Sequence, residues 1–315
     1  MNVLLPIDGS PYSKMAISMV KALQLPVGAR VIVLGVLPEH ALFGGVHFHS
    51  VIGRGEDCLG GHHDYREQKE VEVLQAALKT LRALGVRAEI MNCWGNPGNE
   101  ILKAARDLKA QLIIIGGKGE HGSPRSQLGD VAQKVIRDAH TSVILVKRDT
   151  PRIRKILLAT DGSAYSNAAA DILLGLPLPA QTHIVLMTTV NPRMAAVMKM
   201  PTMDLETNRN FLEQLQRAEE DKARGLLDEL KCRLKSKGYT ISAMVLRGDP
   251  VEEILMVASA VRPELIAIGA KGLTGIEALL LGSVTQKVAS LANCSVLIGR
   301  ATSYRSMSSE VVRSS

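Results

Sequence analysis

Two glycine-rich segments in the second half of the chain have the composition of a phosphate-binding site. Gly269 and Gly272 follow a predicted strand. Gly282 and Ser283 stand at the predicted start of a helix. Glycine lets backbone N–H groups approach an anion closely, and the first turn of a helix offers further N–H groups. Lys271 would add positive charge there, or it is a solvated loop lysine. These residues favour an anion site built mainly from backbone.

Neither of the two common glycine-rich nucleotide motifs explains these segments. The chain contains no GxxxxGK[ST] sequence. Gly117, Gly119 and Gly122 spell GxGxxG, but they follow the fourth predicted strand of the first half. A dinucleotide fingerprint follows the first strand of its domain. We therefore expect neither a P-loop nor a dinucleotide site.

The chain contains two copies of one sequence repeat. The sequence NVLLPIDGSPYS at 2–13 matches KILLATDGSAYS at 155–166, which places Asp8 and Asp161 153 positions apart. A constant register over more than a hundred residues indicates duplication of a whole domain, not a solenoid repeat. The same offset relates Gly95-Asn96-Pro97 to Gly248-Asp249-Pro250, Gly116 to Gly269, Gly119 to Gly272, Gly129 to Gly282, and Gln133-Lys134-Val135 to Gln286-Lys287-Val288.

Each unit alternates strand-like apolar runs with segments of helical spacing. This alternation predicts an α/β fold with two doubly wound, Rossmann-like domains, each a five-stranded parallel sheet in the order 3-2-1-4-5. We expect domains at 1–148 and 155–300, joined by the polar segment 149–154 and followed by a disordered Ser-rich tail at 301–315. In the first unit the expected strands are 3–7, 30–37, 86–93, 112–115 and 142–146, and the expected helices are 10–23, 65–84, 97–110 and 127–139; the second unit repeats them, with a long helix at 205–237.

The fold would bring the candidate residues of the second unit together. In a doubly wound sheet the ligand site lies beyond the carboxyl ends of the strands, where the winding reverses between strands 1 and 4. The segment Thr160-Asp161-Gly162-Ser163 follows strand 1, and the glycine-rich residues 269–285 follow strand 4. A phosphate chain could be held there from both sides with few charged side chains.

A strand followed by DGS, then G(D/N)P, then G-x2-G-x9-G(S/T), resembles the universal stress protein family over almost all of both halves. The resemblance implies the doubly wound α/β fold and, in the nucleotide-binding branch, ATP in this crevice. It implies that Val190 flanks the adenine and that Asp161 lies near the nucleotide, where it could help hold Mg²⁺; the alternative for Asp161 is a helix cap at the Ser163 turn. The implied nucleotide contacts are Thr160, Asp161, Val190, Gly269, Lys271, Gly272, Gly282, Ser283, Val284 and Thr285.

The first half departs from this pattern at two positions. Asp130 stands in place of Ser283, and Ala132 stands in place of Thr285. A hydroxyl bond to a charged phosphate is worth about 1.5–3 kcal/mol. A carboxylate about 4 Å from a phosphate costs about 4 kcal/mol at an effective dielectric near 20. We therefore expect ATP to bind the second half and not the first, unless a metal bridges Asp130.

The segment 38–64 of the first half is rich in metal-ligating side chains. It contains five of the eight histidines. Imidazole and thiolate are ligands that zinc prefers. A zinc site is therefore one interpretation, and a polar surface loop with incidental histidines is the other, because the spacing matches no strong metal template. The candidate metal ligands are His47, His49, Cys58, His62 and His63.

Composition excludes several classes of protein. The formal net charge is +7, but aromatic residues make up only 3% of the chain, so a nucleic-acid surface with aromatic platforms is not expected. No apolar run reaches the roughly 18 residues of a membrane helix. Residues 1–8 lack the features of a secretory signal, and the four cysteines form no CxxC pair. These features favour a cytoplasmic protein.

Three functions remain open from the sequence. The first is a nucleotide-dependent sensor or signalling scaffold in stress response that binds ATP in its second half and meets a protein partner. The second is a weak ATPase, for which no water-activating base or Walker lysine is evident. The third is a nucleotide-free interaction scaffold. Family members often dimerise through strand 5, so we expect Ser142–Val146 to pair with Ser295–Gly299 within the chain as a pseudo-dimer, and further homodimerisation is open.

Overall fold

The computed structural model describes residues 1–37, 65–119, 127–190, 205–235, 237–272 and 281–301. The first half contains β1 (Asn2–Pro6), α1 (Pro11–Leu23), β2 (Arg30–Leu37), α2 (Tyr65–Ala83), β3 (Arg87–Trp94), α3 (Pro97–Asp107), β4 (Leu112–Gly116), α4 (Asp130–Asp138) and β5 (Ser142–Val146). The second contains β6 (Lys155–Ala159), α5 (Ala164–Gly175), β7 (His183–Val190), α7 (Leu205–Lys235), β8 (Thr240–Arg247), α8 (Pro250–Val261), β9 (Leu265–Gly269), α9 (Ser283–Leu291) and β10 (Ser295–Gly299).

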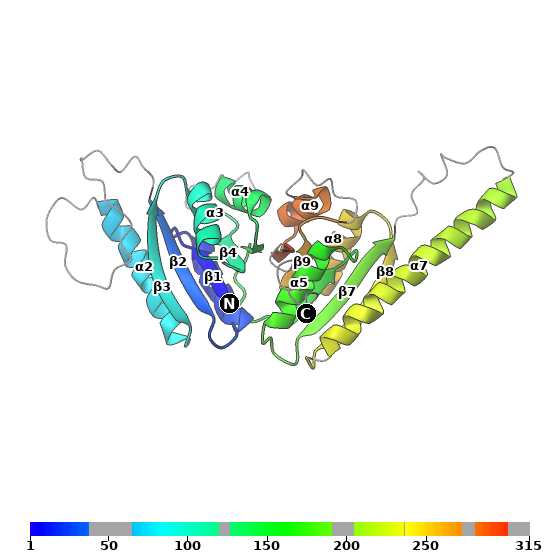
Figure 1. Cartoon of the computed structure of the whole chain (residues 1–315), viewed down its shortest axis with the longest axis horizontal. Coiled ribbons are helices and arrows are strands. Elements are labelled where there is room, and N and C mark those ends of the chain that lie inside the picture. The colour runs from blue at the N-terminus through cyan, green and yellow to red at the C-terminus, as the bar shows by residue number, and fades with distance from the viewer. Residues whose placement is uncertain (38–64, 120–126, 191–204, 236, 273–280, 302–315) are drawn as a thin grey trace, which may run out of the picture.

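The ten strands of the described residues belong to one continuous sheet (Figure 1). Their order is β3-β2-β1-β4-β5-β10-β9-β6-β7-β8, so each half has the predicted order 3-2-1-4-5. Strands within each half are parallel. The central strands are runs of buried aliphatic residues, as expected for parallel strands covered on both faces. The expected doubly wound α/β fold is confirmed.

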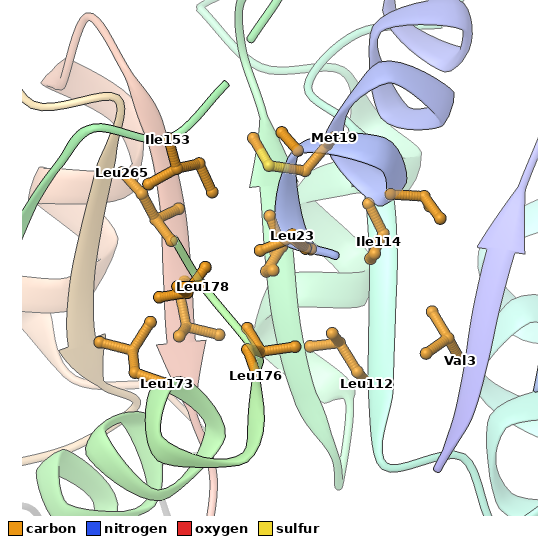
Figure 2. Packing of buried hydrophobic residues seen from close by; sticks show 14 of the residues in the cluster. Val3, Met19, Leu23, Leu112, Ile114, Ile153, Leu173, Leu176, Leu178 and Leu265 are labelled. Atoms are coloured by element: carbon orange, nitrogen blue, oxygen red, sulfur yellow. The ribbon is translucent and has the colours of Figure 1, made fainter. Parts of the chain in front are cut away.

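Helices cover both faces of this sheet. The apolar faces of α1, α2, α5 and α7 pack in one buried cluster, and those of α3, α4, α8 and α9 pack in another. Each cluster extends through both halves. Figure 2 shows the first cluster where the halves meet: Met19 and Leu23 of α1 gather with Ile153 of the linker and with Leu176 and Leu178 of the second half. Within the described residues, no helix is both long enough and apolar enough to cross a membrane.

Local signals in the sequence set where the helices begin. Ser10 caps α1 by accepting the Ser13 N–H at 3.1 Å, as its residue type predicts. Helix α4 was expected from residue 127, but it begins at Asp130 because Gly129 has extended backbone geometry and is the N-cap. Helix α9 begins after Gly282 in the same way. Neither α4 nor α9 has a side-chain cap on its first turn.

The two halves join edge to edge through β5 and β10. These strands are antiparallel, with Val143, Ile144 and Leu145 opposite Ile298, Leu297 and Val296. The predicted pairing of Ser142–Val146 with Ser295–Gly299 is therefore present. The Ser142 hydroxyl accepts the Arg300 N–H at 3.0 Å, and the Ser295 hydroxyl accepts the Lys147 N–H at 3.3 Å. We call this joint the seam.

Two cations cross the seam and cap helices of the opposite half. Lys147 donates through Nζ to the carbonyl oxygens of Ala289, Ser290 and Ala292 at the carboxyl end of α9. Arg300 donates to the carbonyl oxygens of Ile136 and Arg137 in α4, at 2.5 and 3.0 Å. The last carbonyls of a helix lack intrahelical partners and carry partial negative charge. The seam is thus held by helix capping as well as by strand pairing.

We expect Lys147→Met to lower the free energy of unfolding by about 1–3 kcal/mol, because hydrogen bonds from a charged donor to the end of α9 are lost. Urea denaturation of the full chain measures the change. Lys103→Met, at an exposed position of α3, is the matched control. An equal loss in both variants would show that the cross-seam cap contributes nothing.

Cysteine reactivity gives a second test of the seam. Cys294, just before β10, is 4% exposed, and burial raises the pKa of its thiol to about 11. Thiolate is the reactive form, so iodoacetamide at pH 8 should leave Cys294 unmodified in the folded chain. Cys232 is exposed on α7 and should be alkylated. Peptide mass spectrometry reads both sites, and rapid labelling of native Cys294 would contradict the packing.

Candidate nucleotide-binding crevice

The crevice of the second half lies at the carboxyl ends of β6 and β9, where the fold predicted it. Gly269 ends β9 against the first turn of α5. A Cβ on Gly269 would lie 2.5 Å from the Ser166 nitrogen, a distance that no real side chain tolerates. Only glycine lets β9 approach α5 this closely.

Asp161 joins the two loops of the crevice. Its Oδ1 accepts the Ser163 N–H at 3.0 Å, which is the turn-capping role that the sequence left open. Its Oδ2 lies 2.7 Å from the point that a Cβ on Gly272 would occupy. The absence of a side chain at Gly272 therefore lets this carboxylate approach the loop after β9. Asp161 is half-buried, and its hydrogen bond to the Ser163 N–H holds the side chain at the crevice.

A network of hydroxyl groups fixes these loops. Ser163 caps α5 by accepting the Ser166 N–H at 3.2 Å, and its own hydroxyl donates to the Lys271 carbonyl at 3.2 Å. The Thr160 hydroxyl lies 3.0 Å from the Ser166 hydroxyl and accepts the Gly162 N–H at 3.2 Å. Thr160 is 6% exposed. The network ties the end of β6 to the loop after β9.

The first turn of α9 is the part of the crevice best suited to an anion. Gly282 donates its N–H to the Ala270 carbonyl at 2.8 Å, which holds the start of α9 against the loop. The N–H groups of Ser283 and Val284 follow on the uncapped first turn, and Ser283 is exposed. Uncapped N–H groups and the helix dipole attract negative charge.

Thr285 is already engaged. Its hydroxyl donates to the Gly269 carbonyl at 2.6 Å, and the residue is 2% exposed. A hydroxyl has one proton, so the Thr285 hydroxyl cannot donate to a ligand while this bond is made. A nucleotide contact through its side chain stays a prediction, and its direct role in the structure is to hold α9 to β9.

Lys271 is not the solvated lysine that the sequence allowed. It is 9% exposed, and its Nζ lies 5.7 Å from the centre of the Tyr165 ring. A cation at this distance over an aromatic face is attracted by the ring. The positive charge is therefore held beside the α5 end of the crevice.

Val190 closes the carboxyl end of β7, next to this crevice. It is half-buried, and its carbonyl accepts the Gly248 N–H at 3.3 Å. Thr160 reaches β7 through its own N–H, which donates to the Met187 carbonyl at 2.9 Å. Val190 thus lies at the same edge of the sheet as Thr160, and its contact with adenine stays a prediction.

The first half repeats this geometry with different side chains. Asp8 accepts the Ser10 N–H at 3.0 Å, and its Oδ2 lies 2.9 Å from the Cβ position of Gly119. Ile7 replaces Thr160, however, so the hydroxyl at the end of the first strand is lost. The replacement of Thr160 by Ile7 was not identified from the sequence, although the constant 153-residue offset aligns the two positions. Asp130, at the position that corresponds to Ser283, is exposed on the first turn of α4, and Ala132, at the position that corresponds to Thr285, is buried.

The candidate zinc ligands His47, His49, Cys58, His62 and His63 lie outside the described residues. Within the part of the chain that is described, no three His, Cys, Asp or Glu side chains are grouped so that they could hold a metal ion.

We expect Gly269→Ala to destabilise the chain by about 1–3 kcal/mol, because its methyl group would press against the backbone of Ser166. Gly225→Ala on α7 is the control, since nothing lies within 4 Å of a Cβ there. That change should stabilise by about 0.5–1 kcal/mol. Denaturant unfolding measures both, and a neutral Gly269→Ala would disprove the close approach.

Comparisons with known proteins agree with this architecture. The model of the universal stress protein family matches residues 1–147 and 152–300. A universal stress protein of Synechocystis is 25% identical over 304 residues, covering 91% of this chain and 95% of that protein. One from Bacillus subtilis is 27% identical over 146 residues, covering 46% of this chain and 98% of that protein. A crystal structure of a universal stress protein from Archaeoglobus fulgidus has a TM-score of 0.59 at 19% identity, covering 95% of this chain and 96% of that one. The chain therefore belongs to the universal stress protein family, with two copies of its domain in tandem.

Proposed function

We propose that the second half binds ATP in the crevice between β6 and β9 and that the chain acts as a nucleotide-dependent sensor. The observation that carries the proposal is the uncapped first turn of α9, held beside Gly269 and Gly272. The triphosphate would take the N–H groups of Ser283 and Val284 and the backbone of Gly272. Its adenine would lie beside Val190, as the likeness to the nucleotide-binding branch of the family suggests.

Charge distribution supports an anion at this position. Lys271 lies over Tyr165 near the loop, and Asp161 is turned toward Gly272. Asp161 would help hold Mg²⁺ between the loop and the phosphates, because carboxylate oxygen suits that ion. Magnesium would neutralise phosphate charge when bound.

The first half is proposed not to bind ATP at comparable affinity. The Thr285 hydroxyl already donates to the Gly269 carbonyl. The difference in ATP affinity between the halves therefore comes mainly from Asp130 in the first half in place of Ser283 in the second. Asp130 is exposed, so its repulsion of a phosphate about 4 Å away lies between about 1 kcal/mol in water and about 4 kcal/mol at a dielectric near 20. The loss of the Ser283 hydroxyl adds about 1.5–3 kcal/mol.

The contact between the crevice and α7 supports a sensor rather than a simple carrier. Gly162 adopts a φ of +78°, and a Cβ there would lie 3.2 Å from Leu226 of α7. Helix α7 spans Leu205–Lys235, and its amino-terminal end projects past the sheet (Figure 1). A ligand that shifts the 160–163 loop would therefore displace α7. A difference of about 1–3 kcal/mol between two states suffices for such signalling.

The test is calorimetric titration of the full chain with Mg-ATP. We expect one ATP per chain, and Ser283→Asp should weaken binding roughly fiftyfold or more, since it introduces the repulsion and removes the hydroxyl. Asp130→Ser, at the corresponding position of the first half, is the matched control and should leave the affinity of the second half for ATP unchanged. Thermal unfolding of each variant checks that the fold is retained.

Full binding in Ser283→Asp together with tighter binding in Asp130→Ser would place the nucleotide in the first half and overturn the proposal. No binding by the unmodified chain would favour the nucleotide-free scaffold. Steady-state hydrolysis that Asp161→Ala abolishes would favour the ATPase.

A further inference from the structure

Two adjoining hollows lie beside the seam, far from the nucleotide crevice. They have volumes of about 360 and 550 Å³ and share Arg154 and Glu264 in their walls. Both hollows are open to solvent, and the five cationic residues in their walls are exposed. The hollows lie at the linker between the halves. Arg148 of the first half lines one of them, and residues of the linker and the second half form the rest. Their charged lining residues are Arg148, Asp149, Arg152, Arg154, Lys155, Arg262 and Glu264.

The lining has an excess of positive charge. Five cationic side chains face two carboxylates, which leaves a formal excess of three positive charges. The Glu264 carboxylate accepts the backbone N–H groups of Arg154 and Lys155 through Oε2, at 3.0 and 2.7 Å. This carboxylate therefore fixes the linker backbone. Among the described residues, none of the five cations has a carboxylate oxygen within 4.0 Å as an ion-pair partner.

Three of the cations are held in place by neutral oxygen atoms. Arg148 donates to the Pro263 carbonyl at 3.3 Å, and Lys155 donates to the Val261 carbonyl at 3.4 Å. Arg152 donates to the side-chain oxygen of Gln181 at 3.3 Å. Neutral acceptors position a cation without cancelling its charge, and a guanidinium has five N–H donors. The site therefore retains donors and charge for an anion.

The duplicated fold supplies an internal comparison. At the 153-residue offset, Ala301 corresponds to Arg148, and Met1 corresponds to Arg154. Asn2 corresponds to Lys155 and, like it, donates to a carbonyl, that of Leu108. Lys109 corresponds to Arg262 and keeps the positive charge. The equivalent place in the first half thus repeats the backbone geometry but lacks the cationic side chains of Arg148, Arg154 and Lys155. These three cations belong to this joint and not to the repeated domain.

We propose that this joint binds a small anion carrying several phosphate groups, either free or as part of a larger metabolite. Arg148 and Arg154, with Lys155 and Arg262, would hold the phosphate oxygens, since guanidinium groups match phosphate geometry. The site is separate from the nucleotide crevice because Lys155 and Glu264 lie at the amino ends of β6 and β9, whereas the crevice lies at their carboxyl ends. The two are separated by the length of a five-residue strand, about 17 Å.

A concave site favours a small ligand over a nucleic acid. The cations line two hollows and do not follow a helix or strand as a stripe. Nucleic-acid surfaces combine such stripes with aromatic platforms or groove-reading elements, and aromatic residues are 3% of this chain.

The test uses tripolyphosphate as the probe in calorimetric titrations of the full chain carrying Ser283→Asp, which removes the crevice as a competing site. Arg148→Gln combined with Arg154→Gln should weaken binding about tenfold or more, because charge-assisted hydrogen bonds to phosphate are lost. Lys103→Gln combined with Arg106→Gln on α3 removes the same charge at exposed positions and should change affinity by less than about twofold. Titration of ATP into the same Ser283→Asp chain shows whether the joint also binds phosphate groups that belong to a nucleotide.

Equal weakening by the joint and α3 double variants would show that tripolyphosphate follows net charge alone, and it would overturn the proposal. So would unchanged binding in the joint variant, or duplex DNA displacing tripolyphosphate with greater affinity. Arg154→Gln alone, at an exposed position, is the second variant if the double one unfolds. It should weaken binding without changing the midpoint of thermal unfolding, and no weakening in this folded variant would also overturn the proposal.

Discussion

The antiparallel pairing of β5 with β10 is the constraint on which the rest of the structure depends. It turns two five-stranded sheets into one and lets both apolar clusters continue from one half to the other. It also brings Lys147 to the end of α9 and Arg300 to the end of α4. Burial lowers the pKa of the Arg300 guanidinium to about 10, and the negative charges of Tyr165 and Asp138 act against this shift. The seam is thus an apolar interface with a charged, hydrogen-bonded margin.

The seam also supplies the caps for the two helices, α4 and α9, whose first turns lie at the crevices. The first turn of α9 faces the candidate phosphate position, and the last turn of α9 is capped from the other half. The first turn of α4 carries Asp130, and its last turn is capped by Arg300. Each helix therefore has one end in its own crevice and the other end held by the neighbouring half.

Much of the fold could be predicted from the sequence because duplication and strand–helix alternation leave few topologies. The strand order and the cap at Ser10 follow from patterns within the sequence, whereas the pairing of the fifth strands was implied by the resemblance to the universal stress protein family. The bond between Thr285 and Gly269 could not be predicted, because it depends on how closely α9 packs on β9. The burial of Lys271 against Tyr165 and the capping of helices across the seam by Lys147 and Arg300 likewise depend on side chains that meet only in the folded chain. The candidate crevice residues share one edge of the sheet, and which of them touch a nucleotide stays a prediction.

The eight-residue connection between β5 and β6, residues 147–154, changes the thermodynamics of the seam itself. Two separate domains would meet with a probability set by their concentration, whereas two tethered domains meet at an effective concentration set by the tether. Dilution then cannot part them, so the joined sheet persists at any expression level. A partnership that no longer depends on abundance also frees each half to carry different residues, as Ile7 and Thr160 or Asp130 and Ser283 do.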